Sequence, residues 1–189
     1  AQDSTSYGID LYKKPMLSAL LKELNKIKDL GWIRIMYAYP TMMNDELLNT
    51  IKECDKVVKY IDIPLQHSHP EMLKLMNRPA SDYRKLINHI REIIPEVSIR
   101  TTFIVGYPGE TEEHFEHLKS FIKDMKFDRA GVFCYSREKG TPSYSMLPQV
   151  PKRTAKARYK ELMEIQQEIS KERNKTFVGK TIPCIIECY

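Results

Sequence analysis

The sequence predicts an α/β fold whose parallel strands alternate with helices. Four short apolar runs are each followed by a polar loop and then by a segment with helical periodicity. The segments between successive runs are about a dozen residues or longer, which is the crossover length that parallel strands require. Each run is apolar at nearly every position, as expected for strands covered on both faces.

The predicted elements follow one another regularly along the chain. The expected strands cover residues 32–40, 57–65, 97–105 and 129–135. The expected helices cover residues 17–27, 70–77, 82–94 and 152–177, and two more carry Leu47 to Ile51 and Phe115 to Ile122. The expected N-caps, whose side chains can accept hydrogen bonds from the first turn, are Asn44 or Asp45, Ser81 and Thr111.

Three parts are expected in the chain. Residues 1–150 hold only four strands and open on a strand end or loop, so we expect a piece of a larger (β/α) barrel or sheet. Residues 151–178 form a long basic helix that links this piece to the last part of the chain. After Gly179 the run TIPCIIECY alternates as a β-strand does, and residues 179–189 are expected to open a separate all-β module.

Composition excludes several classes of protein. The 189 residues are 42% hydrophobic and 29% charged, with a mean hydropathy of -0.47, which is typical of a soluble globular protein. A membrane span is not expected, because uninterrupted apolar stretches of about 18 residues are absent, and the first residues do not resemble a secretion signal. Four scattered cysteines do not predict a disulfide framework, so the cytoplasm is the expected compartment.

The net charge of +5 lies entirely between Pro151 and Lys180, because this segment contains nine basic and four acidic residues. A solvated helix with paired charges is the favoured interpretation. The alternative is a contact surface for an acidic partner such as RNA, which is possible but not favoured.

Polar residues follow each predicted strand. Because the carboxyl ends of parallel strands meet at one edge, these residues predict a ligand site there. We expect the following residues to share that edge: Gln2, Tyr37, Gln66, Gly106 and Tyr135. The turn GYPGET also offers a close backbone approach and a helix N-terminus at Thr111 for a polar ligand group, although a tight strand-to-helix turn explains it equally well.

A metal site is not predicted. His67 and His69 have the His-x-His spacing of hydrolytic barrels, but the later strand ends supply no further histidine. The remaining histidines fall in helical segments, and the cysteines are expected to pack in the core.

Five segments resemble the radical S-adenosylmethionine (SAM) methylthiotransferase family. In order they are AQDSTSYG, IRIMYAYP, YIDIPLQHSHPEMLKLMNRP, RTTFIVGYPGETEE and YSREKGTPSY, and together they span nearly the whole chain. Gln2-Asp3, Ala38-Tyr39-Pro40 and Pro64-Leu65-Gln66-His67 are more similar to the enzymes that modify an aspartate of a ribosomal protein than to those that modify adenosine in tRNA.

The resemblance implies a partial, TIM-like radical SAM barrel that lacks its first strands. The chain would run from the end of the second strand through the sixth of six, and its last residues would begin a TRAM module, a small β-barrel that holds the substrate. The implied reaction adds a methylthio group to the β-carbon of an aspartate in a small-subunit ribosomal protein, with SAM and 4Fe–4S clusters as cofactors and a separate electron donor.

The resemblance also implies roles for individual residues. Gln2 and Asp3 would hold the amino group of SAM, and Gln66, with Ser68 as a weaker candidate, would contact its ribose or carboxylate. Arg100 would neutralise the carboxylate if its side chain faces into the barrel. The positions implied beside the adenine or the substrate are Ile104, Gly106, Tyr135 and Ser136.

The sequence departs from the family in one respect. The cluster-binding Cys-x3-Cys-x2-Cys is absent from these 189 residues. We therefore expect a fragment that cannot assemble a cluster alone, with the missing segment upstream. The other functions considered are a tRNA-adenosine methylthiotransferase, a metal-dependent barrel hydrolase based on His67 and His69, and a non-enzymatic adaptor that binds through the basic helix.

Overall fold

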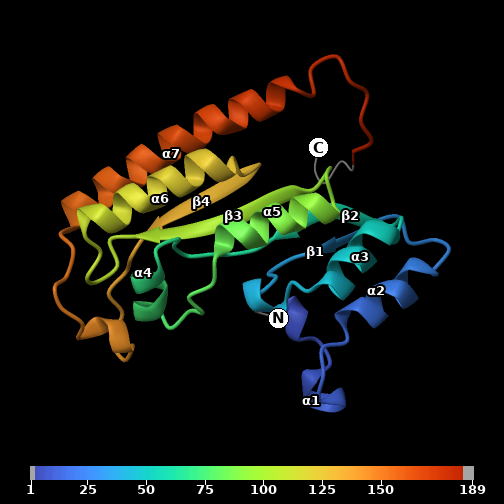
Figure 1. Ribbon diagram of the computed structural model, residues 1–189, viewed down its shortest axis with the longest axis horizontal. Coiled ribbons are helices and arrows are strands. Elements are labelled where there is room, and N and C mark those ends of the chain that lie inside the picture. Colours follow the sequence, from blue (N-terminus) through green and yellow to red (C-terminus); the bar gives the residue numbers. More distant parts are fainter. Residues whose placement is uncertain (1–2, 185–189) are drawn as a thin grey trace.

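The computed structural model describes residues 3–184 and contains a four-stranded parallel sheet (Figure 1). Its strands lie side by side in chain order, and every neighbouring pair is parallel, as predicted. They are β1 (Ile33–Ile35), β2 (Val57–Asp62), β3 (Ser98–Val105) and β4 (Arg129–Cys134).

All four strands are shorter than predicted, and β1 and β2 fall short by three residues or more, for backbone reasons. β1 ends at Ile35 because the chain turns at Tyr37, whose φ is +56°. Regular pairing of β2 ends at Asp62, shortly before Pro64, which has no N–H to donate. It resumes in a single bridge between Gln66 and Phe103.

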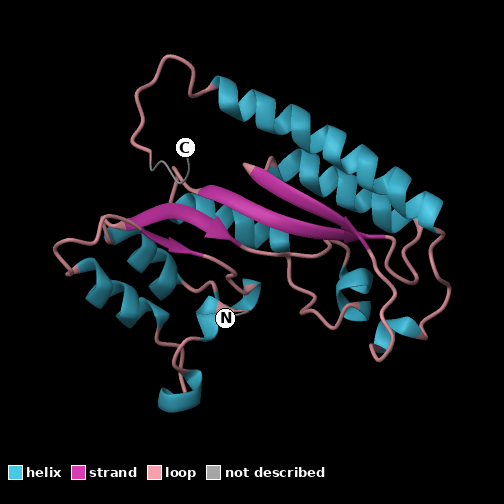
Figure 2. Ribbon diagram, turned by 180° about the vertical axis from the view of Figure 1, so that it is seen from behind, coloured by secondary structure: helices cyan, strands magenta, loops and turns pink. Residues whose placement is uncertain are grey.

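Helices cover one face of the sheet, and Figure 2 looks onto the other face. The helices are α1 (Ile9–Tyr12), α2 (Leu17–Asn25), α3 (Asp45–Glu53), α4 (Pro70–Leu75), α5 (Tyr83–Ile93), α6 (Glu112–Met125) and α7 (Lys152–Lys175). Short 3-10 turns occupy Ser4–Ser6, Pro40–Met42 and Pro142–Tyr144.

The two faces of β3 differ, contrary to the expectation that both are covered. Alternate side chains, from Ile99 to Val105, are buried under the helices, whereas Arg100, Thr102 and Ile104 are partly exposed on the other face. Strands of a barrel wall alternate in this way between an outer face packed on helices and an inner face. The sheet is therefore part of a (β/α) barrel wall.

Aromatic side chains form the centre of the core between the sheet and the helices. Phe103 of β3 lies edge-on to Phe121 of α6 and to Phe127, with ring centroids 6.2 Å and 5.8 Å away. All three rings are almost completely buried. This packing fixes α6 against the strand whose carboxyl end carries the predicted glycine turn.

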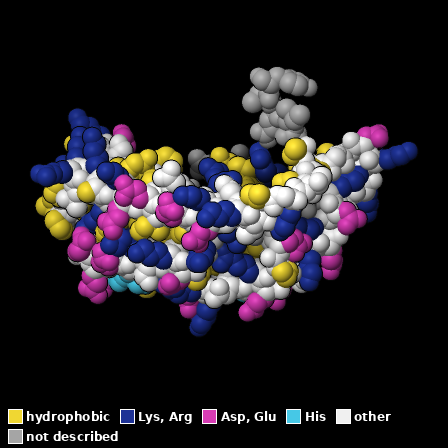
Figure 3. Space-filling model, turned by 90° about the horizontal axis from the view of Figure 1, so that it is seen from above, with side chains coloured by type: hydrophobic (Ala, Val, Ile, Leu, Met, Phe, Trp, Pro, Cys, Tyr) yellow, Lys and Arg dark blue, Asp and Glu magenta, His cyan; other side chains and the backbone are white. Residues whose placement is uncertain are grey.

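α7 packs along β4 and α6 and buries Arg158, Leu162 and Ile169. Several of its charged residues are paired with acids or bases of the same or neighbouring elements, as in the Lys119–Glu161 contact of 2.6 Å. From the α7 side, Lys and Arg side chains lie interspersed with Asp and Glu (Figure 3). The interpretation of a helix with paired charges is thus favoured, with the difference that Arg158 is buried.

The predicted all-β module is only partly within the described residues. Residues 181–184 form no strand, and residues 185–189 lie outside the part of the chain that the structure describes. The core prediction is right for Cys54, which is buried, but wrong for Cys134, which is exposed because the last residues of β4 border a cavity. Cys184 is exposed as well. Among residues 3–184, no helix is long and apolar enough to cross a membrane.

The N-cap of α5 is Asp82, not Ser81 as predicted. The Asp82 carboxylate accepts hydrogen bonds from the backbone N–H groups of Arg84 and Lys85, at 3.1 Å and 3.2 Å. Both residues are cap formers, and only the backbone geometry selects between them. The other expected caps, Asn44 and Thr111, are confirmed.

We expect Asp82→Ala to lower the free energy of unfolding by about 1 kcal/mol, because it leaves two N–H groups of the first turn without a partner. Ser81→Ala, the matched control, should change it by less than about 0.5 kcal/mol. Urea denaturation followed by circular dichroism measures both. Equal losses in the two variants would contradict the cap assignment.

Candidate active site at the carboxyl ends of the strands

Three successive strands end in a left-handed backbone turn. The φ angles of Tyr37, Gln66 and Gly106 are +56°, +70° and +76°. Such angles are uncommon outside glycine, and strained backbone is concentrated at functional sites. No sequence signal marks Tyr37 or Gln66 for this conformation.

Backbone hydrogen bonds tie these turns into one rim. The N–H of Ala38 donates to Asp62, the N–H of Gln66 donates to Thr102, and the N–H of Tyr135 donates to Val105, at 2.7–2.8 Å. The structure therefore brings four of the five predicted rim residues to one edge. The fifth, Gln2, lies outside the described residues.

Two buried polar atoms at this rim have no hydrogen-bond partner among residues 3–184. They are Oε1 of Gln66 and the hydroxyl oxygen of Tyr135. The backbone of Gln66 pairs with Phe103 of β3, and the backbone of Tyr135 pairs with Val105 of β3, so the two residues flank the end of β3 on opposite sides. Buried polar groups without a partner are costly, so a polar ligand would satisfy them.

A cavity of about 480 Å³ adjoins the rim above the start of α7. Three of the predicted site residues, Gly106, Tyr135 and Ser136, line it. Lys152, Lys156 and Arg137 also line it and give it a positive charge. Ile104 precedes this turn on the partly exposed face of β3.

Three predicted site residues are engaged elsewhere. Asp3 caps the first 3-10 turn, accepting a hydrogen bond from the N–H of Thr5 at 2.8 Å. Ser68 is buried and hydrogen-bonded to Nδ1 of His117, at 2.9 Å. Both side chains therefore already have hydrogen-bond partners within the chain. The third is Arg100.

Arg100 lies in the first half of β3, six residues before Gly106, which corresponds to about 20 Å along an extended strand. Its guanidinium donates to Oδ2 of the buried Asp62 at 3.1 Å. The side chain is on the partly exposed face, as the carboxylate role requires, but its charge is already matched and it is far from the rim.

A buried charged network supports the turn at Gly106. Oε2 of Glu110 accepts hydrogen bonds from the Gly106 N–H at 2.6 Å and from Arg158 at 2.7 Å. Nε2 of His67 faces Oε1 of Glu110 at 3.3 Å, and Nδ1 of His67 accepts the N–H of His69 at 3.0 Å. The glycine turn is thus held from α7 and from the loop after β2.

The network has a defined charge state. Burial raises the pKa of Glu110, but its contacts with His67, the Gly106 N–H and Arg158 outweigh burial and hold that pKa below its ordinary value. Burial lowers the pKa of His67, and the nearby Glu110 carboxylate only partly offsets this effect. The two shifts therefore favour an ionised Glu110 beside an uncharged His67.

His67 and His69 do not share a ligand site. His67 is completely buried against Glu110, whereas the His69 ring stacks at a tilt on His114, with centroids 4.4 Å apart. The hydrolase interpretation, which needs both side chains to point the same way, has no support in this geometry.

Sequence reasoning missed Arg158. Its burial could have been found from spacing, because it continues the apolar series of Ala155, Leu162 and Ile169 along one face of α7. Its partner Glu110 is 48 residues away, and sequence alone does not reveal that pairing.

Comparison with known proteins assigns the family. Residues 6–122 match the model of the radical SAM superfamily. This chain belongs to that superfamily. The family implies SAM and an iron–sulfur cluster as cofactors.

Curated relatives refine the placement within the superfamily. The chain is 56% identical to the ribosomal protein uS12 methylthiotransferase RimO of Thermoanaerobacter sp. (strain X514), and 53% identical to that of Carboxydothermus hydrogenoformans. Each match covers 99% of this chain but 43% of the relative. The resemblance predicted from the motifs is confirmed, and the chain spans less than half the length of these relatives.

Two solved structures share the fold. Coproporphyrinogen III oxidase HemN from Escherichia coli superimposes with a TM-score of 0.64 at 21% identity, covering 81% of this chain and 36% of that one. The archaeal Elp3 of Methanocaldococcus infernus gives a TM-score of 0.53 at 17% identity, covering 85% of this chain and 39% of that one. The partial barrel of this radical SAM chain is thus found in more distant proteins as well.

Proposed function

We propose that this chain is the barrel part of a methylthiotransferase that adds a methylthio group to the β-carbon of an aspartate in ribosomal protein uS12. The observation that carries the proposal is the 48–56% identity to uS12 methylthiotransferases over 99% of the chain. A ribosomal substrate implies a cytoplasmic enzyme. The reaction also requires an electron donor.

The rim residues fit SAM. The orphaned Oε1 of Gln66 can accept from a ribose hydroxyl or an ammonium group, and its amide N–H groups can donate to a carboxylate. The Tyr135 hydroxyl offers a second unmatched buried group, and Gly106 lines the adjoining cavity. We assign SAM to Gln66, Gly106 and Tyr135, with Ile104 and Ser136 beside them.

The cysteines of this chain do not fit an iron–sulfur cluster. Cys54 is buried after α3, whereas Cys134 and Cys184 are exposed in other parts of the molecule. Cluster ligands occur in threes or fours at short spacings, so 4Fe–4S ligands are not supplied by these 189 residues.

In this proposal the chain positions and shields the reacting groups. Gln66, Gly106 and Tyr135 would hold SAM, which would supply the radical chemistry needed to remove hydrogen from an unreactive carbon. Gln66 and Tyr135 orient the cofactor, and the Glu110 network keeps the Gly106 turn rigid. Lys152, Lys156 and Arg137 line the adjoining cavity, where the carboxylate of a substrate aspartate finds a positive environment.

The direct test uses a full-length protein that contains these residues, with reconstituted clusters. It is incubated with SAM and either small ribosomal subunits or tRNA, and the products are analysed by mass spectrometry. We expect a methylthio group on a uS12 aspartate. Methylthioadenosine in tRNA with unmodified uS12 would instead identify the tRNA-adenosine enzyme.

We expect Gln66→Ala in the full-length, cluster-loaded protein to weaken SAM binding by about 1–3 kcal/mol, because polar partners are left unpaired in a desolvated site. Calorimetric titration of SAM measures the change. Gln167→Ala, at an exposed position on α7, is the matched control and should leave affinity unchanged. An unchanged affinity together with a lower melting temperature in Gln66→Ala would mean that Gln66 only orders its turn.

A further inference from the structure

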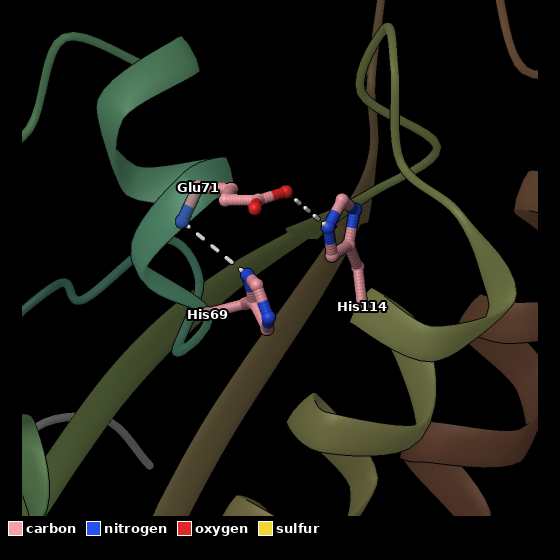
Figure 4. Close-up of side chains that lie close together, drawn as sticks. All are labelled: His69, Glu71 and His114. Carbon is pink, nitrogen blue, oxygen red and sulfur yellow. Dashed lines mark hydrogen bonds and ion pairs between the residues drawn. The ribbon is translucent and has the colours of Figure 1, made fainter.

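The first turns of α4 and α6 face each other on the outer side of the rim. Four of the chain's five histidines lie in this region: His67, His69, His114 and His117. His69 precedes α4, and His114 lies in the first turn of α6. The carboxylate of Glu71, in the first turn of α4, points toward His114 (Figure 4).

We propose that His69, Glu71 and His114 form a binding site for a divalent transition-metal ion of the zinc class. One ligand atom from each residue lies within 4.8 Å of the others. Nε2 of His114 is 3.1 Å from Oε2 of Glu71, and the rings of His69 and His114 are 4.4 Å apart. Two imidazole nitrogens and a carboxylate oxygen form a donor set that zinc prefers.

Existing contacts hold the ligands close to the required arrangement. His114 is buried, and its Nδ1 accepts the N–H of Thr111 at 3.2 Å. Nδ1 of His69 accepts the backbone N–H of Glu71 at 3.3 Å, which holds the ring beside the first turn of α4. Figure 4 shows the two rings and the carboxylate converging from α4 and α6.

Metal binding requires two local changes. The ion takes the place of the hydrogen bond between Nε2 of His114 and the Glu71 carboxylate. The proton on Nε2 of His114 then moves to Nδ1, so Nδ1 can no longer accept the hydrogen bond from the Thr111 N–H. The His69 ring gives up its long bond to the Glu71 N–H and keeps its proton on Nε2. These losses and the high exposure of Glu71 predict moderate affinity.

A fourth position remains for water or for a further side chain. His117 follows His114 by three residues, on the same face of α6, and its ring is 5.1 Å from that of His69. A bound ion would join α4 to α6 and so link the segments that follow β2 and β3. The metal therefore has a stabilising role for the rim and is independent of the proposed methylthio transfer.

The test titrates zinc chloride into the metal-free 189-residue chain, with its exposed thiols alkylated so that these cysteines cannot bind the ion. Isothermal calorimetry is expected to give one equivalent of zinc bound per chain. The melting temperature should rise by about 5–10 °C at a free zinc concentration one hundred times the Kd. Cobalt(II) gives a second readout through its visible spectrum.

Glu71→Gln and His69→Asn remove ligands at partly or fully exposed positions and should each weaken zinc binding by about ten- to a hundred-fold. His89→Gln is the matched control, because His89 is an exposed histidine on α5 paired with Asp45. It should leave the affinity unchanged. No zinc binding by the parent chain, full binding in Glu71→Gln/His69→Asn, or loss of binding in His89→Gln would overturn the proposal.

Discussion

Arg158→Met is expected to lower the free energy of unfolding by about 3–5 kcal/mol, because it leaves the buried Glu110 carboxylate without its positive partner. The side chain of Arg158 is 7% exposed and that of Glu110 is completely buried, so water cannot replace the lost contact. Urea denaturation of the 189-residue chain at neutral pH measures the loss.

Two further variants separate this effect from a general sensitivity to charge removal. Arg84→Met breaks the exposed pair with Asp124 and should cost no more than about 1 kcal/mol. Adding Glu110→Gln to Arg158→Met removes the unpaired charge and should recover part of the loss. A loss in Arg158→Met no larger than that in Arg84→Met would refute the buried network.

Gly106→Ala is expected to destabilise the chain by about 2–5 kcal/mol, for two reasons. A positive φ costs a non-glycine residue about 1–2 kcal/mol. A Cβ atom at Gly106 would also overlap the Cβ of Ala155 on α7, and such overpacking costs about 1–3 kcal/mol.

A matched pair of variants isolates the overlap. Gly140 has a φ of +87° with no atom near its missing Cβ, so Gly140→Ala should show the backbone cost of about 1–2 kcal/mol alone. Ala155→Gly removes the overlapping methyl group, so its addition to Gly106→Ala should restore part of the stability. Equal losses at Gly106 and Gly140, with no recovery by Ala155→Gly, would show that α7 does not press on the turn.

The alternation of strands and helices is enough to predict the parallel sheet and the rim, because those depend on patterns within each segment. The choice of Asp82 over Ser81 and the left-handed turns at Tyr37 and Gln66 depend on backbone angles that no residue type marks there. The expectation that strands are covered on both faces failed for β3, because apolar and polar residues both line the inner side of a barrel wall.

The sequence predicts only those site residues that reach the rim because they directly follow a strand. Gly106 and Gln66 follow strands and therefore reach the rim, whereas the supporting contacts join segments that are distant in sequence. The charge pattern places Arg158 on a solvated helix, because its partner is far away along the chain. The three proposed metal ligands were missed because two helix starts, each ordinary in sequence, happen to face each other.

The order of the strands in the sheet has a consequence for folding. Each strand pairs with the one that precedes it in the chain, so the sheet can grow by adding one βα unit at a time, with short loop closures. The helix α7 can pack only once β3, β4 and α6 are in place, since it packs mainly on those three elements. The geometry around Gly106 is therefore expected to form last, and a nascent chain would hold a nearly complete sheet before it could bind a cofactor.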